Sequence, residues 1–295
     1  MSVKGKIVTD MIRFFTSQKM LGPKIQDGTL RKNLVEPPWH CPDEYLNLPI
    51  HMRQFEMELL TPKAADNGEV VLQLHGGGYI AKIRNAYRDF AVRYSKIDQY
   101  RVLSVDYRVA PQHPYPAAFQ DALEAYRWLL YSGFSGDRII LAGDSAGGGL
   151  VLALAMYLRD QSMPLPKKLV MMSPWTDLTA SGPSYQENYE NDPLFGNTRE
   201  SMIYNGEYAG KQDPKLPYIS PLFGDFRGLP PMLFQVGSLE MLLSDSVLAA
   251  QKAKEAGCDV TLTVYQDMFH VFQLSMDKLA ESRAAWDEVA AFLGK

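Results

Sequence analysis

The sequence has little cysteine, no surplus of basic residues and no long apolar run. Its 295 residues include only Cys41 and Cys258, too few and too far apart for a disulfide framework or a thiolate metal site. Thirty basic and thirty-four acidic residues give a net charge of -4 without a basic block, so nucleic acid is not expected as a partner. No stretch approaches a membrane span, and residues 1–20 carry charges where a signal peptide is apolar. These absences predict a soluble, cytoplasmic protein that does not bind membranes.

Strand-like and helix-like segments alternate regularly from about residue 70 onward. Such an order predicts a mostly parallel sheet with helices on both faces, and the 46% hydrophobic content can fill one large core. The expected strands are residues 53–60, 70–74, 102–105, 138–142, 169–172, 232–236 and 260–265, and the expected helices are 117–131, 242–256 and 278–293.

Two segments fall outside this pattern. Residues 1–50 combine helical spacing of apolar residues with a proline-rich stretch, and we expect them to form an N-terminal cap segment rather than part of the sheet. Residues 181–218 interrupt the pattern a second time and are expected to be a cap insertion with a helix around 199–209. Residues 51–295 would then be the catalytic domain that carries this insertion.

The apolar run before Ser145 leads through Gly143-Asp144-Ser145-Ala146-Gly147 into an apolar helix. In a strand–turn–helix context, Gly-x-Ser-x-Gly indicates a sharp turn that holds the serine strained and exposed. Gly143 and Gly147 would allow the strand and helix to approach closely. Without that context, the motif would be only a glycine-rich turn with an incidental serine.

A second glycine motif, His75-Gly76-Gly77-Gly78, follows directly on an expected strand. Three consecutive glycines let the backbone approach a ligand and leave N–H groups free to bind an oxyanion. A simple hairpin turn is the alternative, although such a turn does not need three glycines. We expect His75 to order this loop rather than to transfer protons.

A nucleophilic serine needs a base and an orienting carboxylate. Of the five histidines, only His270 follows the last expected strand, although its apolar neighbours would also suit a buried core histidine. Glu240 follows the preceding strand, whereas Asp245 lies farther on, where an acid also suits a helix start. The order Ser, Asp or Glu, His along the chain is that of α/β-hydrolases.

These motifs resemble those of the hormone-sensitive-lipase-like branch (bacterial family IV) of the α/β-hydrolase esterases. The shared motifs are HGGG at 75–78, DYRVAP at 106–111, GDSAGG at 143–148, SPWTD at 173–177, LPP at 229–231 and MFH at 268–270. The resemblance covers residues 70–295 and implies an eight-stranded α/β-hydrolase sheet with a helical cap. One departure is that the family usually has Asp where this chain has Glu240.

The resemblance implies Ser145 as nucleophile and His270 as base. It also implies an oxyanion hole formed by the N–H groups of Gly77, Gly78 and Ala146, with Gly76 shaping the loop. The implied activity is that of a serine carboxylesterase acting on short-acyl esters through a Ser-His-Glu triad and an acyl-enzyme, without metal or organic cofactor.

Two alternatives stay open at this point. The same triad could serve an amidase or formamidase, and the fold could serve a non-catalytic ligand receptor, although the presence of His270 argues against the latter. The exposed edge of the last strand, together with the resemblance, suggests a homodimer.

Overall fold

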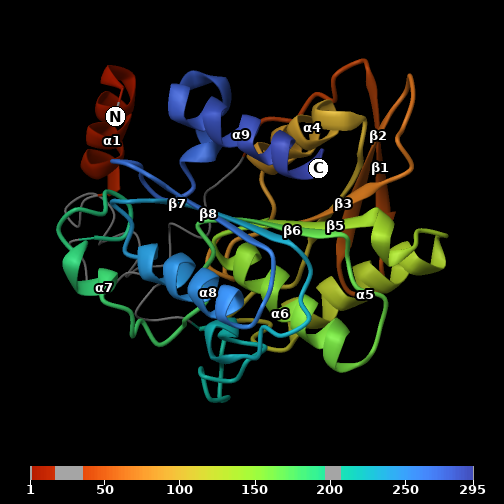
Figure 1. The fold of residues 1–295 in the computed structure, drawn as a ribbon. Helices are drawn as coiled ribbons and strands as arrows, with labels where there is room; N and C mark the ends of the chain where they lie inside the picture. Colours follow the sequence, from red (N-terminus) through yellow and green to blue (C-terminus); the bar gives the residue numbers. More distant parts are fainter. Residues whose placement is uncertain (1, 17–35, 197–206, 295) are drawn as a thin grey trace.

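The computed structural model describes residues 2–16, 36–196 and 207–294, and its centre is an eight-stranded sheet (Figure 1). The strands lie in the order β1-β2-β4-β3-β5-β6-β7-β8; β1–β2 and β2–β4 are antiparallel pairs and every other pair is parallel. The strand bounds are β1 Tyr45–His51, β2 Glu56–Pro62, β3 Val70–Leu74, β4 Arg101–Asp106, β5 Ile139–Asp144, β6 Lys168–Met172, β7 Met232–Gly237 and β8 Val260–Tyr265. The prediction of a mostly parallel, eight-stranded α/β-hydrolase sheet is confirmed.

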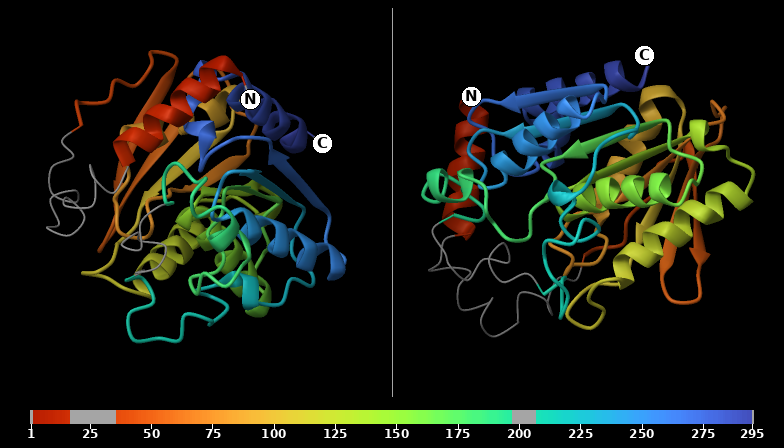
Figure 2. Two further views of the ribbon diagram at one scale, coloured as in Figure 1. Left: turned by 90° about the vertical axis from the view of Figure 1, so that its left-hand side faces the viewer. Right: turned by 60° about the horizontal axis from the view of Figure 1, so that its bottom comes forward.

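Helices cover both faces of the sheet. Helices α4 (Asn85–Asp98) and α9 (Ala280–Leu293) lie on one face; α5 (Ala117–Tyr131), α6 (Ala146–Asp160) and α8 (Leu243–Glu255) lie on the other (Figure 1). Helix α1 (Val3–Thr16) lies beside the C-terminal part of the chain in each view (Figure 2). Val8 and Ile12 of α1 pack there against the cluster that includes Phe269, next to His270. The first helix therefore borders the loop that carries the predicted base.

The four central strands are buried along their whole length. In β3, β5, β6 and β7 every residue is buried, which is why these segments are nearly continuous apolar runs rather than alternating ones. Strand β8 forms an edge, and its residues are exposed or half-buried. The core thus fixes the C-terminal ends of the central parallel strands, where the glycine loops and candidate acids begin.

The prediction that residues 1–50 lie outside the sheet is wrong for residues 45–50. They belong to β1, which pairs with β2 in antiparallel register, with Pro49 opposite Glu58. Proline cannot donate to a ladder, but an edge strand leaves one side unpaired and tolerates it. The sheet therefore begins at Tyr45, inside the proline-rich stretch.

The insertion between β6 and β7 is described in two parts. It contains the short helix α7 (Ser184–Glu187) and, later, the 3-10 turn η2 (Pro221–Phe223), followed by β7. Most of the helix predicted around residues 199–209 lies outside the described residues. The remaining 3-10 segments are η1 (Gly136–Arg138) and η3 (Phe272–Lys278). Within the described ranges, none of the helices is both long and apolar enough to cross a membrane.

Candidate active site

Ser145 occupies the turn between β5 and α6 with a positive φ of 51° and a ψ of -123°. The flanking glycines are required sterically: a Cβ on Gly143 would lie 2.5 Å from the Gly147 carbonyl oxygen, and one on Gly147 would lie 2.0 Å from the Leu74 carbonyl oxygen. The strand–turn–helix arrangement predicted from the sequence is confirmed. A strained turn of this kind presents the serine hydroxyl at the end of the sheet.

His270 lies between β8 and η3, and its imidazole joins the other two predicted residues. Its Nε2 is 2.9 Å from Ser145 Oγ and its Nδ1 is 2.8 Å from Glu240 Oε2. With Nδ1 protonated and donating to the carboxylate, Nε2 accepts the serine hydroxyl proton. All three side chains are buried, and the glutamate is fully so. In this low-dielectric setting the hydrogen bond between the carboxylate and the ring is stronger than it would be in water.

The carboxylate of Glu240 is held on both oxygens. While Oε2 faces the imidazole, Oε1 accepts the Gly237 N–H at 2.5 Å and the Ser173 hydroxyl at 2.7 Å. Ser173 follows β6 at φ 47°, and its hydroxyl also accepts the Val271 N–H at 3.2 Å. Sequence reasoning gave Ser173 no role, although it opens the Ser-Pro-Trp motif that marked the family resemblance.

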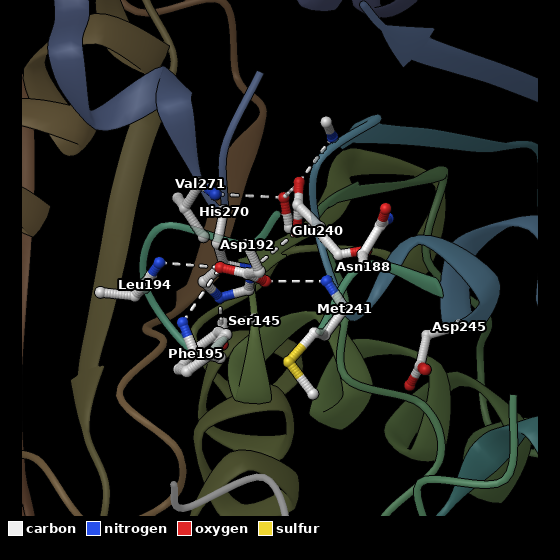
Figure 3. A network of polar contacts seen from close by, with 12 residues as sticks. Ser145, Asn188, Asp192, Leu194, Phe195, Glu240, Met241, Asp245, His270 and Val271 are labelled. Atoms are coloured by element: carbon white, nitrogen blue, oxygen red, sulfur yellow. Dashed lines mark hydrogen bonds and ion pairs between the residues drawn. The ribbon is translucent and has the colours of Figure 1, made fainter. Parts of the chain in front are cut away.

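Asp245, the other acid considered, is engaged elsewhere. Its carboxyl group accepts the N–H groups of Thr176 and Asp177 at 2.7 and 2.8 Å and lies 2.9 Å from the Tyr185 hydroxyl. Figure 3 shows it apart from the Glu240–His270 pair. Burial raises the pKa of Asp245 to about 8, so this side chain is largely protonated at neutral pH.

The Gly76–Gly78 loop lies beside Ser145 with two glycines in the left-handed region. Gly77 has φ 109° and Gly78 has φ 62°, and the Gly77 carbonyl accepts the Ile80 and Ala81 N–H groups. Within the described segments, the Gly77 and Gly78 N–H groups bond to no other group. Ala146 is the first residue of α6, where a helix N–H has no intrahelical partner. These donors can therefore serve a developing oxyanion.

A buried polar network supports this loop from below. The Gly76 N–H donates to the Tyr87 hydroxyl and to Asp144 Oδ1, each at 3.0 Å, and the Tyr87 hydroxyl donates to Asp144 Oδ2 at 3.1 Å. Burial raises the pKa of Asp144 to about 6. Any side chain at position 76 would collide with Asp144, at 2.3 Å from Oδ2. Sequence reasoning missed Asp144, because its role depends on this long-range contact.

His75 belongs to the packing of the same loop. Its Nδ1 donates to the Gly76 carbonyl at 2.7 Å, and its ring stacks on Tyr107 with centroids 4.1 Å apart. Burial lowers the pKa of His75 to about 4, so the ring is neutral at pH 7. These contacts suit a residue that orders the loop.

A cavity of about 390 Å³ opens over the hydroxyl of Ser145. Gly77, Gly78 and His270 line it, and Leu194 and Phe195 from the insertion form part of its wall. The Phe195 ring meets the His270 imidazole edge to face, with centroids 4.7 Å apart. A second, apolar cavity of about 550 Å³ shares His270 and Leu194 with the first and extends under α1.

Comparison with known proteins gives consistent matches. A family model described as the alpha/beta hydrolase fold matches residues 71–274. An acetyl-hydrolase of Streptomyces hygroscopicus is 39% identical over 230 residues, covering 78% of this chain and 77% of the relative. An esterase of Acinetobacter venetianus is 35% identical over 224 residues, covering 76% and 74%.

A solved structure shows the same likeness over the whole chain. The crystal structure of an esterase from the bacterial hormone-sensitive lipase family superposes with a TM-score of 0.85 at 35% identity, covering 99% of this chain and 98% of the other.

Proposed function

Because the chain belongs to the α/β-hydrolase family, as an ester hydrolase of its hormone-sensitive-lipase-like branch, we propose that it cleaves short-acyl carboxylic esters through a Ser145–His270–Glu240 triad. The observation that carries this proposal is the chain of hydrogen bonds from Ser145 Oγ through the imidazole to Glu240, at 2.9 and 2.8 Å. Next to Ser145 lie the N–H groups of Gly77 and Gly78, which have no partner within the described residues. Nucleophile, base and oxyanion donors thus share one cavity.

In the acylation step, Ser145 Oγ attacks the ester carbonyl carbon while its proton passes to His270 Nε2. The carbonyl oxygen becomes an oxyanion that accepts the N–H groups of Gly77, Gly78 and Ala146. Glu240 stabilises the imidazolium and keeps Nδ1 protonated. When the carbon–oxygen bond to the alcohol breaks, Nε2 returns the proton to the leaving oxygen and the acyl group stays on Ser145.

Deacylation repeats these steps with water. His270 removes a proton from a water molecule as its oxygen attacks the acyl carbon, and Nε2 then protonates Ser145 Oγ as the acid leaves. No step requires a metal or an organic cofactor.

The preference for short acyl groups rests on the wall over the nucleophile. Leu194 and Phe195 cover the cavity close to His270, which limits the volume available next to Ser145. The description of a 39%-identical relative as an acetyl-hydrolase supports a small acyl group here as well.

The test is kcat/KM for aryl esters with acyl chains of two to twelve carbons, beside a matched aryl amide. We expect the highest values at about two to six carbons and much lower values for the amide. Efficiency that rises through twelve carbons would contradict the limit that Leu194 and Phe195 place on the cavity, and an amide cleaved as fast as the ester would favour an amidase. The Ser145→Ala variant measures the background for each substrate.

A further inference from the structure

The segment 188–195, between α7 and the undescribed residues 197–206, lies against the loop that carries Glu240 (Figure 3). Asn188 Nδ2 donates to the Glu240 carbonyl at 2.8 Å, and the Met241 N–H donates to Asp192 Oδ2 at 2.7 Å. The Glu240 carbonyl and the Met241 N–H belong to one peptide group. The two side chains of the insertion therefore hold both polar ends of the peptide that follows the triad acid.

The other oxygen of Asp192 points to the covering residues. Asp192 Oδ1 accepts the Leu194 N–H at 2.8 Å and the Phe195 N–H at 3.0 Å. Leu194 and Phe195 line the Ser145 cavity, and the Phe195 ring lies against His270. One buried carboxylate thus connects the backbone of the triad acid to the wall over the base.

The position of the Glu240–Met241 peptide affects the contact between Glu240 and His270, because the glutamate side chain cannot move to compensate for a shift of its backbone. Its Oε1 is fixed by Gly237 and Ser173, so a shift of the Glu240–Met241 peptide moves the Cα and displaces Oε2 from His270 Nδ1. Misplacing a catalytic group by about 1 Å can cost about a hundredfold in rate. Contacts from the insertion to this peptide therefore influence the position of Glu240 relative to His270.

We propose that Asn188 and Asp192 are positioning residues that seat the triad acid, so that Glu240 meets His270 only when the segment 188–195 is docked. This rests on the proposed role of Glu240. Asp192 also lies close to His270, because its Oδ1 accepts the Phe195 N–H and the Phe195 ring contacts the imidazole. Burial raises the pKa of Asp192, and its three backbone N–H partners oppose that rise.

The main test compares Asp192→Asn and Asn188→Ala with the wild type at a saturating short-acyl ester. In Asp192→Asn the amide oxygen can still accept the N–H groups of Leu194 and Phe195. The NH₂ group then faces the Met241 N–H, so the hydrogen bond between position 192 and Met241 is lost. We expect kcat per fluorophosphonate-titrated active site to fall about tenfold to a hundredfold in both variants, with KM little changed. The control is Asn191→Ala, an exposed asparagine of the same segment, which should keep the wild-type kcat.

A double substitution separates positioning from general damage. If Asp192 acts through the acid, Asp192→Asn should lower kcat little further in a Glu240→Gln background. An equal loss in both backgrounds would overturn the proposal, as would wild-type kcat in the single variants. Activity in Ser145→Ala would instead overturn the proposed function itself, so the two failures are distinguishable.

The pH profile of kcat/KM gives a readout that a merely structural role would not move. Several charged groups surround His270: Glu240 at Nδ1, Asp192 from the insertion, Asp144 below the cavity, and Arg84, Glu36 and Lys278 at the cavity edges. Displacing Glu240 from His270 Nδ1 disfavours the imidazolium, so the acidic limb should move to lower pH in both Asp192→Asn and Asn188→Ala. The shift should be larger in Asp192→Asn, which also loses a negative charge. An acidic limb that stays in place in both variants would contradict the positioning role.

Discussion

Replacing Glu240 by glutamine should abolish nearly all ester hydrolysis, because the structure admits only one orientation of the new amide. The Gly237 N–H, 2.5 Å from Oε1, and the Ser173 hydroxyl both use that oxygen as an acceptor. The amide oxygen must therefore take the Oε1 position, since an NH₂ there would face the Gly237 N–H. The NH₂ then points at His270 Nδ1.

That orientation forces the wrong tautomer on the base. An NH₂ donor requires Nδ1 to be unprotonated, which moves the ring proton to Nε2, where it faces Ser145 Oγ. Nε2 then cannot accept the serine proton, and the imidazolium formed later has lost its buried counter-charge. Removing the acid in serine triads costs about 10⁴-fold in kcat. A loss of that size corresponds to about 5 kcal/mol of transition-state stabilisation.

The assay is kcat for a short-acyl aryl ester, normalised to folded protein by circular dichroism and thermal unfolding. Glu240→Asp serves as a matched control, because it keeps the charge while shortening the side chain by one methylene. We expect it to retain more activity than Glu240→Gln. A folded Glu240→Gln variant that stays within tenfold of the wild type would refute this reasoning.

Three further predictions separate local chemistry from stability. Asp245→Asn should keep most of the activity at pH 7, because the native side chain is largely protonated there; kcat lower than in Glu240→Gln would mean that Asp245 is the acid. Between about pH 4 and 8 the unfolded chain releases the Asp245 proton while the folded chain retains it, so the wild-type Tm should fall with rising pH. Asp245→Asn should make this dependence of Tm on pH weaker. An unchanged dependence would mean that Asp245 does not cause it. Gly77→Ala and Gly257→Ala both force alanine to a positive φ, at 109° and 82°, which should cost about 1–2 kcal/mol of stability at Gly257. Gly77→Ala should cost more, because its Cβ would also lie 2.8 Å from Ala81 Cβ. Only Gly77→Ala should also lower kcat, by about a hundredfold, because it distorts the oxyanion donors; equal kcat in both variants would contradict that role.

The sequence was sufficient for the features that are encoded locally. The turn at Ser145 could be predicted because its glycines stand between an apolar strand and an apolar helix, and His270 because it follows the last strand. Strand β1 was missed because Pro49 lies inside it, and only the pairing with β2 shows that it is an edge strand.

Long-range polar contacts could not be predicted from spacing. Ser173 reaches Glu240 across 67 residues, and Asp192 reaches Met241 across 49. Asp192 does not differ in local sequence from an ordinary loop residue, and the motif that Ser173 opens does not by itself assign this serine a partner. Their roles follow only from how the loops meet at the end of the sheet.

The most direct test of the account is to identify the atom that carries the acyl group. The protein is incubated with a fluorophosphonate and, separately, quenched in acid during turnover of a short-acyl ester, and the modified peptide is located by mass spectrometry. We expect the adduct on Ser145 in both experiments, and neither adduct nor turnover in Ser145→Ala. An adduct on another residue, or wild-type turnover by Ser145→Ala, would contradict it.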